Sequence, residues 1–191
     1  MIAGVDEAGR GCLAGPVVAA AVLWPAGKKL EGLADSKTLN EARRDSLRHT
    51  LECILPEDHW GIGIADPDEI DAMNILQATY LAMHRAIEAL CPPPDHLLID
   101  GNRFKPFPGI THQCEVKGDA RFQAISAASI FAKTERDRLM MEGHNLYPQY
   151  GWNKNKGYPS VGHREALEIH GSCPWHRRSF TWKRVQLRLD L

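Results

Sequence analysis

A long apolar run near the start of the chain limits the fold more than any other feature of the sequence. The run, GPVVAAAVLW at residues 15–24, follows the strand-like segment IAGVD at residues 2–6 after a turn rich in glycine. Gly9, Gly11 and Gly15 can supply the positive φ that a tight reversal of the chain requires. The sequence therefore predicts two strands joined by a tight turn.

Two segments in the first half have the patterns of helices, and a short strand separates them. Residues 38–55 begin with Thr38 and Glu41 in capping-box spacing, and leucines follow at helical intervals. The segment WGIGIA then alternates as a strand does. After it, Asp66 is a favourable N-cap, and apolar residues recur at steps of three or four as far as Leu90. This second pattern predicts one continuous helix.

The second half alternates between strands and helices. HLLID at residues 96–100 is an almost continuous apolar strand, of the kind that is buried on both faces. ITHQCEVK at residues 110–117 is a weaker strand, and the sequence becomes helical again from Asp119. After Tyr147 the chain is irregular, aromatic and basic, with one short helix. The order of elements predicts an α/β protein with a mixed sheet flanked by helices.

The composition is that of an ordinary globular protein and excludes several classes. The chain has 191 residues, a length typical of one domain, and 43% of them are hydrophobic. No stretch reaches the ~18 to 20 apolar residues that spanning a bilayer requires. The carboxylates at positions 6 and 7 are incompatible with a secretory signal, and the five cysteines form no CxxC pair. We therefore expect reduced thiols and a cytoplasmic protein without a membrane segment.

The net charge of −1 hides an asymmetry between the two halves. Residues 1–100 contain 8 lysines and arginines against 16 acidic residues, whereas residues 101–191 contain 15 against 8. A basic half is typical of a surface that binds a polyanion, although two solvated faces of opposite charge would give the same counts.

Acidic side chains occur at three predicted strand ends. Asp6 and Glu7 lie where the first strand ends, Asp100 ends HLLID, and Asp119 follows Gly118 at the end of another strand. Ligands of open α/β sheets gather at such ends, and carboxylates brought together there would repel one another unless a cation neutralised them. Oxygen ligands favour Mg²⁺ or Mn²⁺, and two such ions suit in-line phosphodiester cleavage. Ordinary turns and helix caps also place Asp here, so the pattern alone leaves both interpretations open.

The segment Gly9-Arg10-Gly11 directly follows the first acidic pair. Its small residues could let backbone amides approach a phosphate or a sugar closely. A hairpin turn requires glycine as well, so this second interpretation stays open.

Asp137 is not expected to be a further metal ligand. In an unbroken helix from Asp119, 18 residues at about 1.5 Å each would separate the two carboxylates by ~27 Å. An ion pair between Asp137 and Arg136 or Arg138 is predicted instead.

A zinc site is not expected either. His170, Cys173 and His176 form HxxCxxH, with His163 available as a fourth group, but the spacing matches no common structural zinc site.

Taken together, nine segments of the chain resemble ribonuclease HII, the prokaryotic type 2 ribonuclease H. They follow the family's order and cover nearly the whole chain. The matching segments are VDEAGRG (5–11), GPVVAAAV (15–22), DSKTL (35–39), EIDAMNILQAT (69–79), LLIDGN (97–102), VKGD (116–119), ISAASIFAKTERDRLM (125–140), PQYGWNKNKGYP (148–159) and HRRSF (176–180).

This resemblance implies a fold and an activity. The fold would be a ribonuclease H-like mixed five-stranded sheet with helices on both sides. The activity would be hydrolysis of the phosphodiester bond on the 5′ side of a ribonucleotide, which leaves 3′-hydroxyl and 5′-phosphate ends. The substrates would be RNA–DNA hybrids and duplex DNA that carries a single ribonucleotide, so the enzyme would remove ribonucleotides from DNA.

The resemblance also assigns the catalytic residues. The family's acidic tetrad matches Asp6, Glu7, Asp100 and Asp119, which would hold two Mg²⁺ or Mn²⁺ ions in the substrate complex. These are the four carboxylates at the predicted strand ends.

The residues that bind substrate follow from the same comparison. Gly9, Arg10 and Gly11 match the loop that reads the 2′-hydroxyl, the group that distinguishes RNA from DNA. Tyr158 matches a tyrosine that packs near the scissile ribonucleotide, and Lys37 is expected to meet a phosphate.

One catalytic domain spanning residues 1–191 is therefore expected, and a basic segment at about 148–191 would complete its substrate face. Four cations of this segment, Lys154, Lys156, Arg177 and Arg178, would add phosphate contacts without sequence preference. A monomer is expected. The sequence ends without the helical extension that some members carry, so no duplex contact through such an extension is expected.

Two other classes of function compete with this interpretation. A non-catalytic nucleic-acid-binding relative would show a substituted carboxylate, and all four are present. A phosphatase or nucleotide hydrolase acting on small molecules would need a closed pocket and no basic face.

Overall fold

The computed structural model describes residues 1–33 and 39–181. Its five strands are β1 (Ile2–Ala8), β2 (Val17–Leu23), β3 (Trp60–Ala65), β4 (His96–Asp100) and β5 (Thr111–Glu115). Its α-helices are α1 (Glu41–Ile54), α2 (Pro67–Met73), α3 (Ile75–Glu88), α4 (Gln123–Leu146), α5 (Trp152–Asn155) and α6 (Val161–His170).

The strands form one mixed sheet in the order β3-β2-β1-β4-β5. The first hairpin pairs β1 with β2 in antiparallel fashion, and β2 pairs antiparallel with β3. On its other side β1 pairs in parallel with β4, which pairs in parallel with β5. The predicted mixed five-stranded sheet is confirmed, and β1 lies at its centre.

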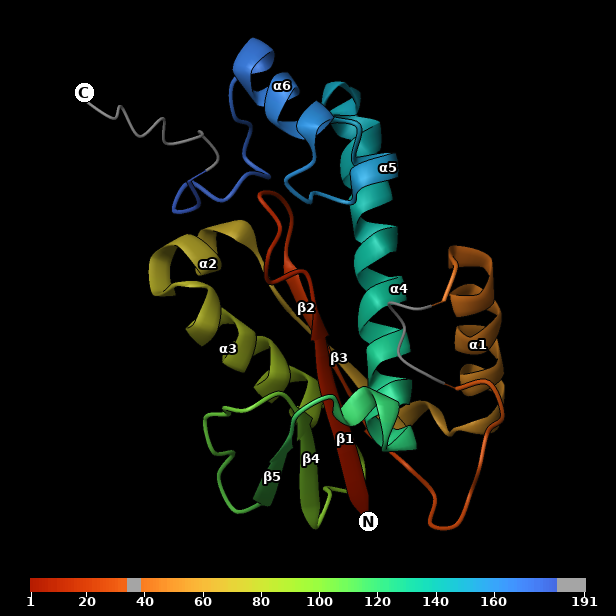
Figure 1. Cartoon of the computed structure of the whole chain (residues 1–191). Coiled ribbons are helices and arrows are strands. Elements are labelled where there is room, and N and C mark those ends of the chain that lie inside the picture. Colours follow the sequence, from red (N-terminus) through yellow and green to blue (C-terminus); the bar gives the residue numbers. More distant parts are fainter. Residues whose placement is uncertain (34–38, 182–191) are drawn as a thin grey trace, which may run out of the picture.

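Helices cover both faces of this sheet (Figure 1). On one face, α3 packs against inward residues of β1, β2 and β4, among them Val5, Ala19 and Ile99. On the other face, α4 and α1 pack against Ala20 and Val22 of β2. Because side chains of a strand alternate between faces, each central strand contributes to both layers of the core.

A very close approach between sheet and helix occurs at Gly4 of β1. A Cβ atom placed there would lie 2.2 Å from the backbone carbon of Ala124 in α4. Only glycine fits at this distance, and this contact brings the start of α4 against the strand that carries Asp6.

The predicted starts of the first two helices have different outcomes. The first helix begins at Glu41, after Asn40, whose side chain accepts a hydrogen bond from the Arg43 N–H. The predicted cap, Thr38, lies outside the described residues. The Asp66 capping box is confirmed, with both reciprocal hydrogen bonds present.

The prediction of one continuous helix as far as Leu90 was wrong, because the chain breaks at Asn74. This residue has φ 71° and ψ 160°, and it ends α2 and caps α3. Its side chain accepts hydrogen bonds from the N–H groups of Leu76 and Gln77. Apolar spacing does not detect the break, because the two helices present their apolar residues at compatible intervals.

Strand β4 and helix α4 also needed correction. Only Leu97 and Ile99 of β4 are fully buried, so the strand is not buried on both faces. Asp119 belongs to a 3-10 turn, Gly118–Ala120, and α4 starts at Gln123.

The C-terminal segment forms a third apolar cluster at one end of α4. Tyr150, Trp152 and Leu167 pack there on Leu13 and Met140. The segment thereby covers the loop that joins β1 to β2. In the described part of the chain, no helix has the length and apolarity needed to cross a membrane.

Candidate active site

The sheet register brings two of the predicted carboxylates together. In the parallel pairing of β1 with β4, Val5 lies opposite Ile99. The next residue of each strand is acidic, Asp6 and Asp100. Val5 and Ile99 pack toward α3, so strand alternation turns both carboxylates toward the opposite face, where α4 lies.

A tight turn adds the third carboxylate. Lys117 has a positive φ of 55° and leads into the 3-10 turn that contains Asp119. The Gly118 N–H donates to Asp100 Oδ1 over 2.8 Å, which joins this turn to the end of β4. One oxygen each of Asp6, Asp100 and Asp119 lies within 4.8 Å of the others.

The electrostatics of Asp6 fit a bound cation. Burial raises the pKa of the Asp6 carboxyl well above its usual range, and the neighbouring carboxylates Glu7 and Asp100 raise it further. Asp6 Oδ1 accepts from the Glu7 N–H over 2.7 Å, whereas the buried Oδ2 has no hydrogen-bond partner among the described residues. Clustered oxygen donors suit a hard divalent ion, which would neutralise this repulsion.

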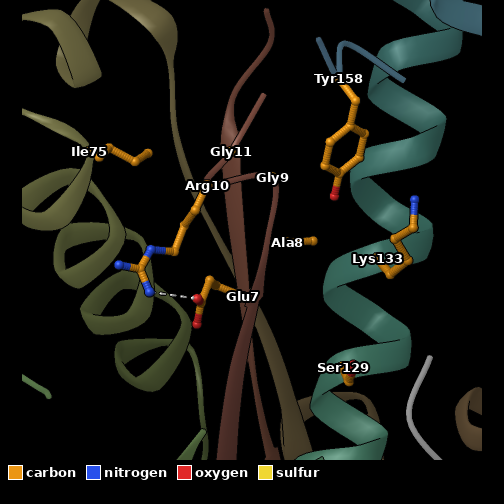
Figure 2. A pocket seen from close by; sticks show the side chains of 9 residues that line it. All are labelled: Glu7, Ala8, Gly9, Arg10, Gly11, Ile75, Ser129, Lys133 and Tyr158. Atoms are coloured by element: carbon orange, nitrogen blue, oxygen red, sulfur yellow. Dashed lines mark hydrogen bonds and ion pairs between the residues drawn. The ribbon is translucent and has the colours of Figure 1, made fainter. Parts of the chain in front are cut away.

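Glu7, the fourth predicted ligand, lies outside this three-oxygen cluster. It follows Asp6 in β1, so its side chain projects from the other face of the sheet. There its Oε1 accepts from Arg10 Nη1 over 3.2 Å (Figure 2). Glu7 also lines two adjoining cavities, one beside the glycine turn and one beside Asp100.

The glycine turn is a tight reversal held against α4. Gly9 has φ 97°, and its carbonyl accepts from the Cys12 N–H over 3.3 Å. A Cβ at Gly9 would lie 1.9 Å from Arg136 Nε, so glycine is required for both conformation and space. Gly15 also has a positive φ, but Gly11 does not, and no atom lies within 4 Å of a Cβ placed there.

The turn forms one wall of a cavity of about 520 Å³, and Tyr158 and Lys133 form the opposite wall (Figure 2). The complete lining is Glu7, Ala8, Gly9, Arg10, Gly11, Ile75, Ser129, Lys133 and Tyr158. The structure therefore brings the predicted turn, the predicted tyrosine and Glu7 to one cavity. Lys37, the remaining predicted residue, lies outside the described residues.

Tyr158 is held at its backbone and its ring. Its carbonyl oxygen is 2.9 Å from His163 Nδ1, and its ring lies 5.8 Å from the Arg136 guanidinium carbon. Burial raises the pKa of the Tyr158 phenol, and the neighbouring Cys12 thiol raises it further. The phenol is therefore protonated at neutral pH and able to donate a hydrogen bond.

The predicted phosphate-binding cations are mostly engaged within the protein. Lys156 is buried, with its Nζ 2.8 Å from the Asn153 carbonyl oxygen, and Arg177 is 2% exposed. Arg178 pairs with Asp68 and Asp71 of α2. Of the four cations, Lys154 is exposed and forms no ion pair among the described residues, so its contact with phosphate stays a prediction.

Asp137 is ion-paired as expected, but with other partners. Its carboxylate lies 2.5 Å from Lys133 Nζ and 3.6 Å from an Arg44 nitrogen. The predicted partners face elsewhere: Arg136 donates to backbone carbonyls, and Arg138 pairs with glutamates of its own helix.

The HxxCxxH segment does not converge on a zinc-binding point. His176 Nε2 lies 3.1 Å from His163 Nε2, whereas Cys173 Sγ lies 3.2 Å from the other nitrogen, Nδ1, of His176. His176 thus lies between Cys173, whose N–H donates to its Nδ1, and His163. The exposed His170 instead makes an edge contact with Tyr150. Cys173, His176 and His163 form a chain of polar contacts that ends at the Tyr158 carbonyl.

Sequence reasoning missed two polar residues of the cavity, Ser129 and Lys133. They lie four residues apart on α4, and therefore on one face of that helix. Ser129 lies beside Asp6 and lowers its pKa, and the i, i+4 spacing identifies Lys133 as the neighbour of Ser129 over the cavity. Burial lowers the pKa of Lys133, although Asp137 opposes this shift.

Comparison with known proteins decides the family. The family model for ribonuclease HII matches residues 3–183. This chain belongs to the ribonuclease HII family. It is accordingly a ribonuclease H, a divalent-metal-dependent endonuclease acting on RNA–DNA hybrids.

Relatives and solved structures agree with this assignment. Ribonuclease HII of Parabacteroides distasonis is 55% identical over 187 residues, 98% of this chain and 93% of the relative. Ribonuclease HII of Porphyromonas gingivalis is 55% identical over 177 residues, 93% of this chain and 87% of the relative. The ribonuclease H2 structure from Pyrococcus horikoshii has a TM-score of 0.77 and 30% identity, covering 95% of this chain and 94% of that one. The shared fold is that of ribonuclease H.

Proposed function

We propose that this ribonuclease HII cleaves the phosphodiester bond on the 5′ side of ribonucleotides. The substrates are RNA–DNA hybrids and duplex DNA with a single embedded ribonucleotide, and the products carry 3′-hydroxyl and 5′-phosphate ends. The observation that supports this most strongly is the shared cavity. The glycine turn and Tyr158 line it together with Glu7, the residue adjacent to the buried Asp6.

Asp6, Glu7, Asp100 and Asp119 would hold two Mg²⁺ or Mn²⁺ ions in the substrate complex. Asp6 would be the principal ligand, because its buried Oδ2 has no hydrogen-bond partner among the described residues and one of its oxygens lies in the three-carboxylate cluster. When bound, the ions would supply an activated water and stabilise the departing 3′-oxygen. The Gly118 N–H holds Asp100 in place.

The groups that select the ribose belong to the glycine turn and to Tyr158. Gly9, Arg10 and Gly11 hold the ribonucleotide at the turn, and the Tyr158 phenol reaches the cavity from the opposite wall. A 2′-hydroxyl can accept and donate hydrogen bonds at this position, whereas a deoxyribose offers neither group. Lys37 is proposed to contact a neighbouring phosphate, and Lys154 adds sequence-independent affinity.

One domain that acts as a monomer in the cytoplasm remains a prediction from the sequence.

The ribonuclease HII of a PCNA:RNase HII complex from Archaeoglobus fulgidus has a TM-score of 0.78 to this chain and 27% identity, covering 93% of this chain and 92% of that one.

The test uses an end-labelled DNA duplex containing one ribonucleotide, incubated with the protein and Mg²⁺ or Mn²⁺. We expect one cut on the 5′ side of the ribose, abolished by EDTA and absent from an all-DNA duplex. Binding of the duplex without cleavage would contradict the proposal and favour a non-catalytic binding protein.

A further inference from the structure

A buried arginine lies behind the glycine turn, on the side away from the cavity. Arg177 Nη2 donates to the Gly9 carbonyl over 2.8 Å, and Nη1 donates to the Arg10 carbonyl over 3.0 Å. Its Nε donates to the Gly15 carbonyl over 2.9 Å. One side chain, 2% exposed, thus binds three backbone carbonyls of the segment between β1 and β2.

These hydrogen bonds fix the direction of the neighbouring N–H groups. In a trans peptide the C=O of one residue and the N–H of the next point in opposite directions. The carbonyls of Gly9 and Arg10 point to Arg177, so the N–H groups of Arg10 and Gly11 point away from it. Within the described residues, neither N–H has a hydrogen-bond acceptor. Both residues line the cavity, so two adjacent donors face it.

We propose that Arg177 is a positioning residue that sets ribose selectivity, by holding the Gly9–Gly11 turn with two N–H donors facing the scissile ribonucleotide. The inference rests on the proposed reading of the 2′-hydroxyl by this turn, and it adds the residue on which that reading depends. Arg177 itself does not line the cavity.

The chemistry of the side chain fits this role and excludes a phosphate contact. Three separate nitrogens of one planar group reach three carbonyls, an arrangement that a single lysine nitrogen cannot reproduce. Burial lowers the pKa of Arg177 to about 10, so the group remains a cation at neutral pH. Its guanidinium also lies 5.1 Å from the Phe180 ring, in the interior.

The test compares Arg177→Lys with the unchanged enzyme on two substrates in one assay. The first readout is kcat/KM on a duplex with one ribonucleotide, and the second is the inhibition constant of an uncleaved all-DNA duplex added as competitor. The competitor reports phosphate contacts under the same metal conditions. Arg138→Lys is the matched control, because Arg138 is exposed and, within residues 1–33 and 39–181, forms ion pairs only with Glu135 and Glu142.

We expect Arg177→Lys to lower kcat/KM at least tenfold while the inhibition constant changes less than twofold. An equal loss in both readouts would overturn the proposal, because it would indicate a phosphate contact or general unfolding. Unchanged kcat/KM in the folded variant would overturn it too. If the unchanged enzyme fails to distinguish the ribonucleotide duplex from the competitor, the proposed function itself has failed, before any variant is compared.

A second variant keeps the test decisive if Arg177→Lys does not fold. Phe180→Leu retains the arginine but removes the ring beside its guanidinium. A smaller loss of kcat/KM, again with an unchanged inhibition constant, supports the proposal. In the folded Phe180→Leu variant, a rise in the inhibition constant without a loss of kcat/KM would overturn it.

Discussion

The carboxylate cluster and the glycine turn lie side by side but are positioned by different means. Asp6 and Asp100 are neighbours because two parallel strands pair in one register, so backbone hydrogen bonds place them. The turn at Gly9 is instead held by buried side chains, Arg136 and Arg177, from distant parts of the chain. The chemistry therefore depends on sheet register, and recognition depends on a few long side chains that single substitutions can remove.

The largest effect expected is on the carboxylate side of this comparison. Asp6→Asn should reduce turnover by at least about a thousandfold, equal to about 4 kcal/mol of transition-state stabilisation. The fold should survive, because the substitution removes a buried carboxylate that neighbouring carboxylates repel. Steady-state cleavage and the melting temperature measure the two expectations. Activity close to that of the unchanged enzyme would exclude Asp6 as a metal ligand.

The turn can be tested by two glycines of the same loop. Gly9→Ala should lower the free energy of unfolding by ~2 to 4 kcal/mol, because alanine at φ 97° is strained and its Cβ collides with Arg136. Gly11→Ala should cost less than ~1 kcal/mol, because its Cβ meets open space. Urea denaturation compares the two variants. Equal destabilisation would show that the turn is not held as described.

The polar chain behind Tyr158 predicts a pH dependence of stability. Burial and the nearby His163 together lower the pKa of His176 to about 4, whereas in the unfolded chain the value is 6.5. Between these pH values the unfolded chain binds a proton that the folded chain does not, so stability falls as pH falls from 6.5 to 4. The loss amounts to ~3 kcal/mol at most.

His176→Gln should flatten this part of the stability curve, and exposed His170→Gln is the control that should leave it unchanged. Urea denaturation at a series of pH values measures the difference. An identical slope in His176→Gln and the unchanged protein would contradict the buried neutral histidine.

The smallest effect concerns the contact between α2 and the C-terminal segment. Burial would raise the pKa of Asp71, but hydrogen bonds from Ser179 and Arg178 lower it overall. Asp71→Ala removes the acceptor of their two N–H groups and should cost ~1 to 2 kcal/mol of stability. Arg138→Ala, which removes only surface ion pairs, should cost less than ~0.5 kcal/mol. Equal thermal shifts in the two variants would argue against the anchoring role of Asp71.

Sequence patterns predicted that Asp6 and Asp100 lie close together, and they did so for a physical reason. Apolar runs mark buried strands, and a carboxylate directly after such a run must lie at a strand end, as Asp100 does. The register that joins it to Asp6 follows from the burial of Val5 and Ile99 on one face. Local information therefore carries most of that arrangement.

The side chains around the glycine turn were harder to place from the sequence, because a charged residue type does not reveal whether the residue is buried. Arg177 and Lys156 were expected on a surface that binds phosphates, yet they lie inside the protein and bind carbonyl groups. The acceptors of Arg177 are more than 100 residues away in the sequence, and that of Lys156 is the Asn153 carbonyl in the short helix α5. No periodic pattern encodes such contacts. The break at Asn74 escaped detection for a similar reason, since the apolar spacing continues through it.

The contact between Arg177 and Gly9 joins residues 168 positions apart, and this separation has a consequence for synthesis on the ribosome. The strands and the carboxylates of the first two-thirds of the chain are made before the arginine that shapes the turn. A nascent chain can thus contain the acidic cluster while its ribose-binding turn still lacks its support. Recognition is completed last, so an unfinished polypeptide holds the acidic residues before it acquires the means to choose a substrate.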